Sequence, residues 1–154
     1  MTHQDYMRQA LALAQEAAAA GEVPVGCVIV DKDSQVIDRG RNRREEEKNP
    51  LAHAELDAIA DACRRYGDWR LKGARLYVTL EPCPMCAGGI ISARIPEIYY
   101  GAKDAGFGAC GSILNLFEED FRHHPKIVGH ILEAECAALL RDFFAQVREK
   151  EMQT

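Results

Sequence analysis

Two short segments of this chain carry the side chains that bind a transition metal. His53-Ala54-Glu55 supplies an imidazole and a carboxylate, and Pro82-Cys83-Pro84-Met85-Cys86 supplies two thiols. A structural zinc site is closed by four protein ligands, whereas a catalytic one keeps a position for water. One imidazole and two thiolates therefore predict a water-activating zinc on His53, Cys83 and Cys86. The fold must bring these two segments together.

A Cys-x-x-Cys pair alone could also be a redox pair, half of a zinc ribbon, or a chance occurrence. This pair does not stand early in a βαβ unit, where redox pairs lie, and no second pair exists, although a ribbon could recruit Cys63 or Cys110. His53 falls near the start of one predicted helix, and Cys83 and Cys86 fall at the start of another. Helix N-termini favour thiolates. Two such starts, facing each other at the carboxyl ends of strands, would form a ligand cradle.

The remaining carboxylate, Glu55, lies two residues after the histidine. Positions i and i+2 do not share a helix face, so Glu55 should not bind the same ion. From the first helical turn it could still reach the open position, take a proton from water and return it to a leaving nitrogen. The alternative is a solvated glutamate that stabilises the helix N-terminus. The neighbouring metal ligands favour the catalytic interpretation.

The length of the chain fits one domain, residues 1–154, with a full core. No apolar run approaches the roughly 20 residues that cross a bilayer, and the polar N-terminus does not resemble a signal peptide. We therefore expect a cytoplasmic protein without a membrane partner. Its six cysteines should be reduced there, although an even number would also allow disulfides. Cys27 and Cys136 lie in apolar patterns typical of core residues.

The net charge of −5 argues against indiscriminate binding to polyanions. A nucleic-acid partner would need a local basic surface. The residues that could form one are Arg39, Arg41, Arg43, Arg44, Lys48, Arg70, Lys72, Lys103, Arg122 and Lys126.

The hydrophobic pattern predicts an opening hairpin followed by alternating strands and helices. We expect helices at about 4–20, 52–66 and 84–92, strands at 25–30, 36–41, 74–80 and 95–100, and a weak strand at 126–129. Segments 42–49 and 101–111 should be loops. This order predicts an α/β fold, a three-layer α/β/α sandwich with a mixed central sheet.

A last helix is indicated by an apolar stripe with helical spacing. The stripe consists of Cys136, Leu139, Leu140, Phe143, Phe144 and Val147. Such a stripe favours packing in the core or against a subunit over a cofactor site.

The combined pattern His-x-Glu and Pro-Cys-x-x-Cys resembles the signature of zinc nucleobase deaminases, with their cytidine deaminase-like fold. Nearly the whole chain also resembles the bacterial tRNA-specific adenosine deaminases. The segments that carry this likeness are Glu22-Val23-Pro24-Val25-Gly26, Asn42-Arg43, Ala52-His53-Ala54-Glu55, Trp69-Arg70-Leu71, Leu76-Tyr77-Val78-Thr79-Leu80-Glu81-Pro82-Cys83, Met85-Cys86-Ala87-Gly88, Gly101-Ala102-Lys103-Asp104, Gly111-Ser112 and Glu135-Cys136-Ala137-Ala138-Leu139-Leu140.

The resemblance implies hydrolytic deamination of adenosine to inosine at the wobble position of a tRNA anticodon. It implies a homodimer with one Zn²⁺ per subunit, held by His53, Cys83 and Cys86. Glu55 would be the proton shuttle while water attacks C6 of a flipped adenine and ammonia leaves.

The same resemblance implies four substrate contacts. Asn42 would bind the nucleotide, Val25 and Leu80 would line the pocket, and Asp104 would lie beside the flanking nucleotides. Apart from the resemblance, Asn42 can both donate and accept but also suits a turn at a strand end. Asp104 also suits a loop cap, because phosphates repel a carboxylate that does not meet a ribose hydroxyl.

Two features depart from that family's pattern. The family often has Asn-His-Arg after the position of Phe121, where this chain reads Arg122-His123-His124. The nucleotide contact of that asparagine is therefore not carried over, although an arginine could hold phosphate instead. The acidic run Glu45–Glu47 is expected to be a solvated loop directed away from RNA.

Two other functions are compatible with the metal motif. A deaminase of a free base or nucleoside, such as cytosine, guanine or cytidine, would use the same zinc chemistry, and the negative net charge mildly favours it. A non-catalytic, zinc-stabilised binding module would not need an open coordination position. The likeness in the loops and the last helix favours RNA.

Overall fold

A five-stranded mixed sheet forms the centre of the computed structural model, which describes residues 1–153. Its strands are β1 (Gly26–Val30), β2 (Val36–Arg41), β3 (Arg75–Leu80), β4 (Glu97–Ala102) and β5 (Lys126–Val128), in the order β2-β1-β3-β4-β5. β1 is antiparallel to both β2 and β3, whereas β3, β4 and β5 are parallel. The weak strand predicted near the C-terminal end completes the sheet.

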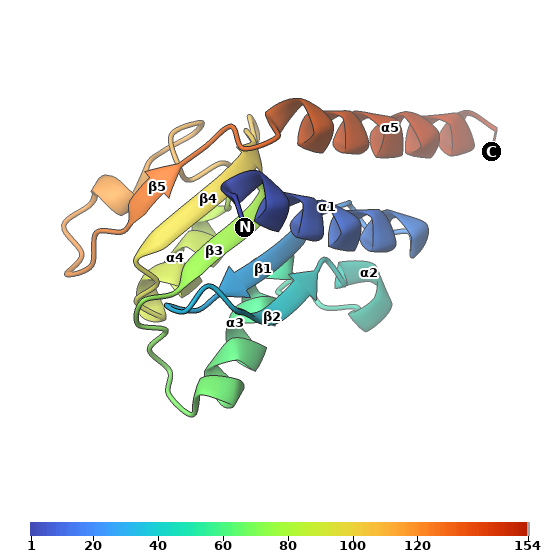
Figure 1. Cartoon of the computed structure of the whole chain (residues 1–154). Helices are drawn as coiled ribbons and strands as arrows, with labels where there is room; N and C mark the ends of the chain where they lie inside the picture. Colours follow the sequence, from blue (N-terminus) through green and yellow to red (C-terminus); the bar gives the residue numbers. More distant parts are fainter. Residues whose placement is uncertain (154) are drawn as a thin grey trace.

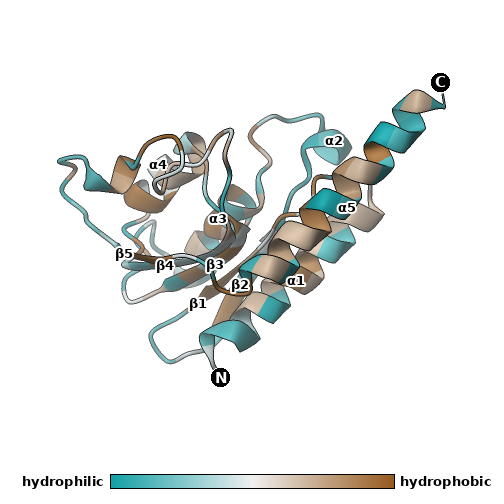
Figure 2. Cartoon of the chain, turned by 90° about the horizontal axis from the view of Figure 1, so that it is seen from above, coloured by the Kyte–Doolittle hydropathy of each residue, from teal (hydrophilic) through white to brown (hydrophobic). Residues whose placement is uncertain are grey.

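Helices cover both faces of the sheet. α1 (His3–Ala19) and α5 (Glu133–Met152) lie side by side on one face, and α3 (Ala54–Tyr66) and α4 (Pro84–Ser92) lie on the other (Figures 1 and 2). The predicted three-layer α/β/α sandwich is confirmed. None of the helices within residues 1–153 has the length and apolar character needed to cross a membrane.

The side chains of β1 divide between the two layers of the core. Cys27 and Ile29 pack in the cluster with α3 and α4, and Val28 and Val30 pack in the cluster with α1 and α5. All of β1 is buried, as expected of a strand covered on both faces. Cys27 is a core residue as predicted, and so is Cys136, which packs from α5.

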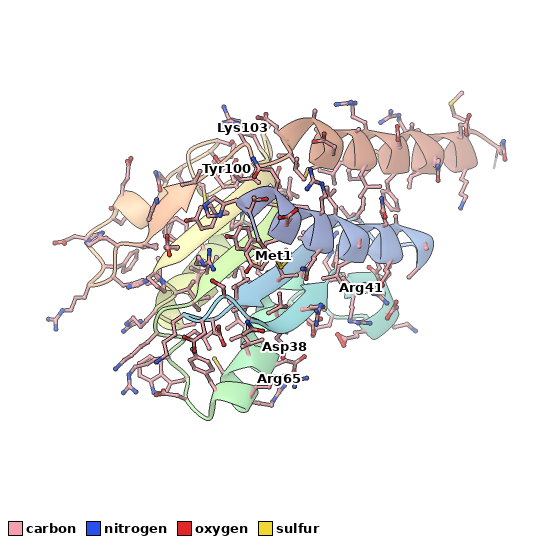
Figure 3. All side chains as sticks on the ribbon, viewed as in Figure 1. Met1, Asp38, Arg41, Arg65, Tyr100 and Lys103 are labelled. Atoms are coloured by element: carbon pink, nitrogen blue, oxygen red, sulfur yellow. The ribbon has the colours of Figure 1, made fainter. Side chains whose placement is uncertain are left out.

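Close backbone packing fixes the position of α3 on the sheet. A Cβ atom at Gly40 of β2 would lie 2.3 Å from the carbonyl oxygen of Ala54 and 2.7 Å from the nitrogen of Ala58, so only glycine fits. Farther along, Asp38 of β2 and Arg65 of α3 point toward each other (Figure 3), with Nε 2.8 Å from Oδ2. The first turn of α3, which follows His53, therefore has a defined place against β2.

The predicted loop at 42–49 was wrong over its middle, where a short helix, α2 (Arg44–Glu47), forms. The buried carboxylate of Glu22 accepts hydrogen bonds from the backbone N–H groups of Glu45 and Glu46, at 3.0 and 2.7 Å. These bonds satisfy donors that a helix N-terminus leaves free. The acceptor is remote in sequence, so local patterns give no sign of it.

The predicted loop at 101–111 was also wrong at its first two residues, which belong to β4. Ala102 pairs with Leu80 of β3, and Gly101 lets α5 cross the strand closely. A Cβ atom at Gly101 would lie 2.4 Å from the sulfur of Cys136. A short 3-10 helix at Leu116–Glu118 was not predicted.

Candidate active site

Four chain segments meet at one edge of the sheet. β2, β3 and β4 run in the same direction, so their carboxyl ends share this edge, and β1 starts there because it runs the opposite way. Val25 precedes β1, Asn42 follows β2, Cys83 follows β3 and Asp104 follows β4. This is the side of an open α/β sheet where ligands usually bind.

The three predicted metal ligands lie at two helix N-termini. His53 is the N-cap residue of α3, and Cys83 is the N-cap residue of α4, with Cys86 in the first turn of that helix. Their ligand atoms all lie within 4.8 Å of one another. The predicted meeting of the two helix starts is confirmed.

The spacing of these atoms fits a tetrahedral zinc ion. Nδ1 of His53 lies 3.6 Å from Sγ of Cys83 and 3.5 Å from Sγ of Cys86. Bonds of about 2.0 Å to nitrogen and about 2.3 Å to sulfur, meeting at the tetrahedral angle, separate the two ligand atoms by about 3.5 Å. Within residues 1–153 no other His, Cys, Asp or Glu joins this group, so Cys63 and Cys110 do not complete a ribbon. The set matches a zinc site with three protein ligands.

The two thiols of the ligand group differ in their pKa. The hydrogen bond from Cys86, together with His53, lowers the pKa of the Cys83 thiol to about 4. The same interaction with Cys83, with burial, raises the pKa of Cys86. The hydrogen bond with Cys83 also raises the pKa of the His53 imidazole. A thiolate next to an imidazole is a donor set that zinc prefers.

Glu55 is a buried carboxylate beside this group, with only 4% of its surface exposed. It stands in the first turn of α3 and is not part of the ligand cluster, in agreement with the i, i+2 argument. Burial raises its pKa to about 7. A carboxyl group with such a pKa can both take up and release a proton near neutral pH.

A cavity of about 580 Å³ opens over the ligand group. Its size is within the range of about 300–1,000 Å³ typical of small-molecule sites. It is lined by His53, Glu55 and Cys83, and by all four residues that the sequence predicts to contact substrate: Val25, Asn42, Leu80 and Asp104. Side chains predicted from four separate segments are thus gathered around one cavity.

Asn42 is held in place by its own backbone surroundings. Its Nδ2 donates to the carbonyl oxygen of Val23, and its Oδ1 accepts from the N–H of Arg44, both at 3.3 Å. These are the contacts of a turn residue, and they orient the amide at the cavity wall.

Asp104 forms a loop cap. Its Oδ1 accepts hydrogen bonds from the N–H groups of Gly106 and Phe107, at 3.0 and 3.1 Å. The cap fixes the turn that follows β4, and Asp104 still lines the cavity.

The cations suggested as a basic surface differ in their environment. Arg41, beside α2 in Figure 3, pairs with Glu46 at 2.6 Å, and Arg43 pairs with the same carboxylate at 3.2 Å. Arg44 and Lys103 form no ion pair with any part of the chain that the structure describes, and both line the cavity. Because Arg44 follows β2 and Lys103 follows β4, positive charge flanks the site from two sides.

Several apolar residues of the cavity were not recognised from the sequence, among them Phe107, Leu140 and Phe144. Leu140 and Phe144 of α5 line the cavity, although their stripe was predicted to serve packing. That interpretation holds for Cys136, which is buried against the sheet. Phe107 lies in a glycine-rich loop without periodicity, so no sequence pattern could identify it.

Glu81 organises the loop that follows β4. It is 2% exposed, and its carboxylate accepts hydrogen bonds from the N–H groups of Asp104, Cys110 and Ser112 and from the Ser112 hydroxyl. Burial alone would raise the pKa of Glu81, but the bonds from Ser112 and the backbone outweigh it and lower the pKa. A Cβ atom at Gly108 would lie 2.3 Å from this carboxylate, so the loop closes tightly around it.

We expect Glu81→Gln to loosen this loop while leaving the metal ligands intact. In the wild-type protein both oxygens of the carboxylate accept hydrogen bonds, whereas the amide of the variant turns an NH₂ group toward some of the same donors. Each lost hydrogen bond to a charged group is worth about 1.5–3 kcal/mol. Hydrogen exchange measured by mass spectrometry should be at least about tenfold faster over residues 104–112, with zinc content unchanged. Glu118→Gln, at an exposed position outside the cavity, is the matched control. Unchanged exchange in the Glu81 variant would refute the assignment.

Comparison with known proteins agrees with this geometry. Residues 1–102 match the family described as the cytidine and deoxycytidylate deaminase zinc-binding region. The tRNA-specific adenosine deaminase of Bacillus subtilis is 44% identical over 147 residues, which cover 95% of this chain and 91% of that protein. Its counterpart in Streptococcus pyogenes serotype M18 is 42% identical over 95% of this chain and 92% of that protein.

Two solved structures extend the comparison. One, from studies of A-to-I editing by tRNA:A34 deaminases, has a TM-score of 0.85 and 44% identity, and covers 88% of this chain and 99% of that one. Guanine deaminase from Bacillus subtilis has a TM-score of 0.65 and 39% identity, covering 70% of this chain and 72% of that one. The matched residues 1–102 include the whole His-Cys-Cys group and Glu55, and the chain belongs to the cytidine and deoxycytidylate deaminase family.

Proposed function

We propose that this chain hydrolytically deaminates adenosine to inosine at the wobble position of a tRNA anticodon. The observation that carries the proposal is the extent of its likeness to tRNA-specific adenosine deaminases, which covers 95% of the chain. It continues past residue 102, where the family match ends, and so extends into the part of the chain that holds the Asp104 loop and α5. Residues of these segments, among them Asp104 and Phe144, line the cavity and would decide which substrate enters.

In this proposal the protein side chains divide the chemistry between them. His53, Cys83 and Cys86 would hold the zinc, which supplies a Lewis acid that activates water. Glu55 takes a proton from the attacking water and delivers it to the nitrogen that leaves. The water oxygen bonds to C6 of the purine, the bond from C6 to the exocyclic nitrogen breaks, and ammonia departs. A pKa of about 7 suits a group that must both accept and donate.

The remaining cavity residues suit a nucleotide within RNA. Val25 and Leu80 provide apolar walls for the base, and the amide of Asn42 can donate and accept. Asp104 would face a ribose hydroxyl of a neighbouring nucleotide. Arg44 and Lys103 offer positive charge to phosphates, so a chain with a net charge of −5 can still bind RNA locally.

Deamination of a free base is the second candidate function. It is favoured by the 39% identity to guanine deaminase from Bacillus subtilis, over 70% of this chain. Such an enzyme would use the same metal ligands and Glu55 but would not depend on a polynucleotide.

An assay with several substrates separates these functions. An anticodon stem-loop with adenosine at the wobble position is compared with free adenine, guanine, cytosine and cytidine. We expect inosine to form in the stem-loop alone. Glu55→Gln should keep its zinc and lose about 10²- to 10⁴-fold in turnover, whereas Glu16→Gln, an exposed glutamate on α1, should behave as wild type. Turnover of free bases alone would overturn the tRNA proposal, and an active Glu55→Gln protein would remove the proton-shuttle role.

We also propose that the enzyme is a cytoplasmic homodimer with one zinc per subunit. All six cysteines are free thiols, which suits a reducing compartment. The C-terminal part of α5 extends beyond the end of α1 (Figure 2), and Phe144 of α5 is 42% exposed. Light scattering should give twice the chain mass of 17.1 kDa. A mass of one chain at all concentrations would contradict the dimer.

A further inference from the structure

Phe107 is a large aromatic side chain that the fold does not bury. It is 70% exposed, although it lies on the wall of the cavity above the zinc ligands. The other four phenylalanines of the chain are all less exposed, including Phe144 at 42% and Phe117 at 5%. An exposed aromatic side chain at the rim of a nucleic-acid site serves as a platform on which a base can stack.

The loop holds Phe107 in a defined position. Its N–H donates to Oδ1 of Asp104, and the next residue, Gly108, donates its N–H to the carbonyl oxygen of Asp104. Gly108 also packs against the buried carboxylate of Glu81, which leaves no space for a Cβ atom there. The loop is therefore anchored on both sides of Phe107, while the ring itself contributes little to the packing of the fold.

The charge near Phe107 indicates what kind of ligand its ring would bind. Lys103, which also lines the cavity and has no ion pair among residues 1–153, can attract a phosphate. An aromatic face next to a cation is the combination with which proteins bind single-stranded nucleic acid, because each base can stack on the ring while the backbone meets the charge. A base that enters the cavity necessarily brings its neighbours in the strand to the rim.

We propose that Phe107 stacks on the nucleobase adjacent to the adenosine that enters the cavity. This inference rests on the proposed action on RNA. It makes Phe107 a residue for substrate binding, with no part in proton transfer. Its loss should therefore raise KM for RNA and leave kcat nearly unchanged.

The test compares four side chains at this position. Phe107→Ala should lower kcat/KM on the anticodon stem-loop by about 5- to 150-fold, the range for loss of one stacked base. Phe107→Leu keeps the apolar volume without the ring and should lose nearly as much, whereas Phe107→Tyr should retain activity. Phe121→Ala, an equally drastic change at a 46% exposed phenylalanine outside the cavity, is the matched control.

Modified substrates then identify the stacked base. Stem-loops with an abasic site directly before or directly after the target adenosine are assayed with wild type and with Phe107→Ala. At one of the two positions the abasic site should strongly lower the kcat/KM of the wild-type enzyme. It should hardly change the kcat/KM of Phe107→Ala, because the two changes remove the same contact. Additive losses at both positions would overturn the proposal, as would full activity of Phe107→Leu or a subunit mass altered by Phe107→Ala. A wild-type enzyme inactive on every stem-loop would instead refute the tRNA proposal itself.

Discussion

The site depends on two helix N-termini that meet at one edge of the sheet. His53 caps α3 and Cys83 caps α4, and neither side chain is used to satisfy the helix that it precedes. Both are therefore available to a shared ion, and the free N–H groups of the helices favour the negative charge of the thiolates. The backbone contact at Gly40 sets α3 against β2, and the parallel pairing of β3 with β4 sets the start of α4. The spacing of 3.5–3.6 Å between nitrogen and sulfur follows from these two placements.

Two buried carboxylates hold the remaining walls of the cavity. Glu22 accepts from the first N–H groups of α2, which carries Arg44, and Glu81 accepts from the loop that carries Asp104 and Phe107. A buried carboxylate is stable only when its oxygens accept hydrogen bonds. Each of the two carboxylates therefore stabilises the one conformation of its neighbouring segment that supplies the donors. The part of the site that would contact RNA is thus fixed by two buried carboxylates.

Much of this arrangement is predictable from local patterns. Each of several features is encoded by a short stretch of neighbouring residues: the buried run at β1, the hairpin, and the helix starts at His53 and Cys83. The spacing of the ligands identifies the metal chemistry. What could not be predicted depends on contacts between distant segments. α2 forms because Glu22 lies beside it, and β4 continues to Ala102 because Ala102 pairs with Leu80 of β3. The roles of Glu81 and Phe107 also depend on such contacts, because the loop that follows β4 folds around the Glu81 carboxylate and carries Phe107.

X-ray absorption spectroscopy at the zinc edge can count the protein ligands and detect the open position on which the proposed chemistry depends. We expect two sulfur ligands at about 2.3 Å and two nitrogen or oxygen ligands at about 2.0 Å, one of them exchangeable solvent. Glu55→Gln should leave this spectrum unchanged, because Glu55 is not a ligand. Three or four sulfur ligands, or a loss of one oxygen ligand in the Glu55→Gln protein, would rule out a catalytic zinc held by His53, Cys83 and Cys86 alone.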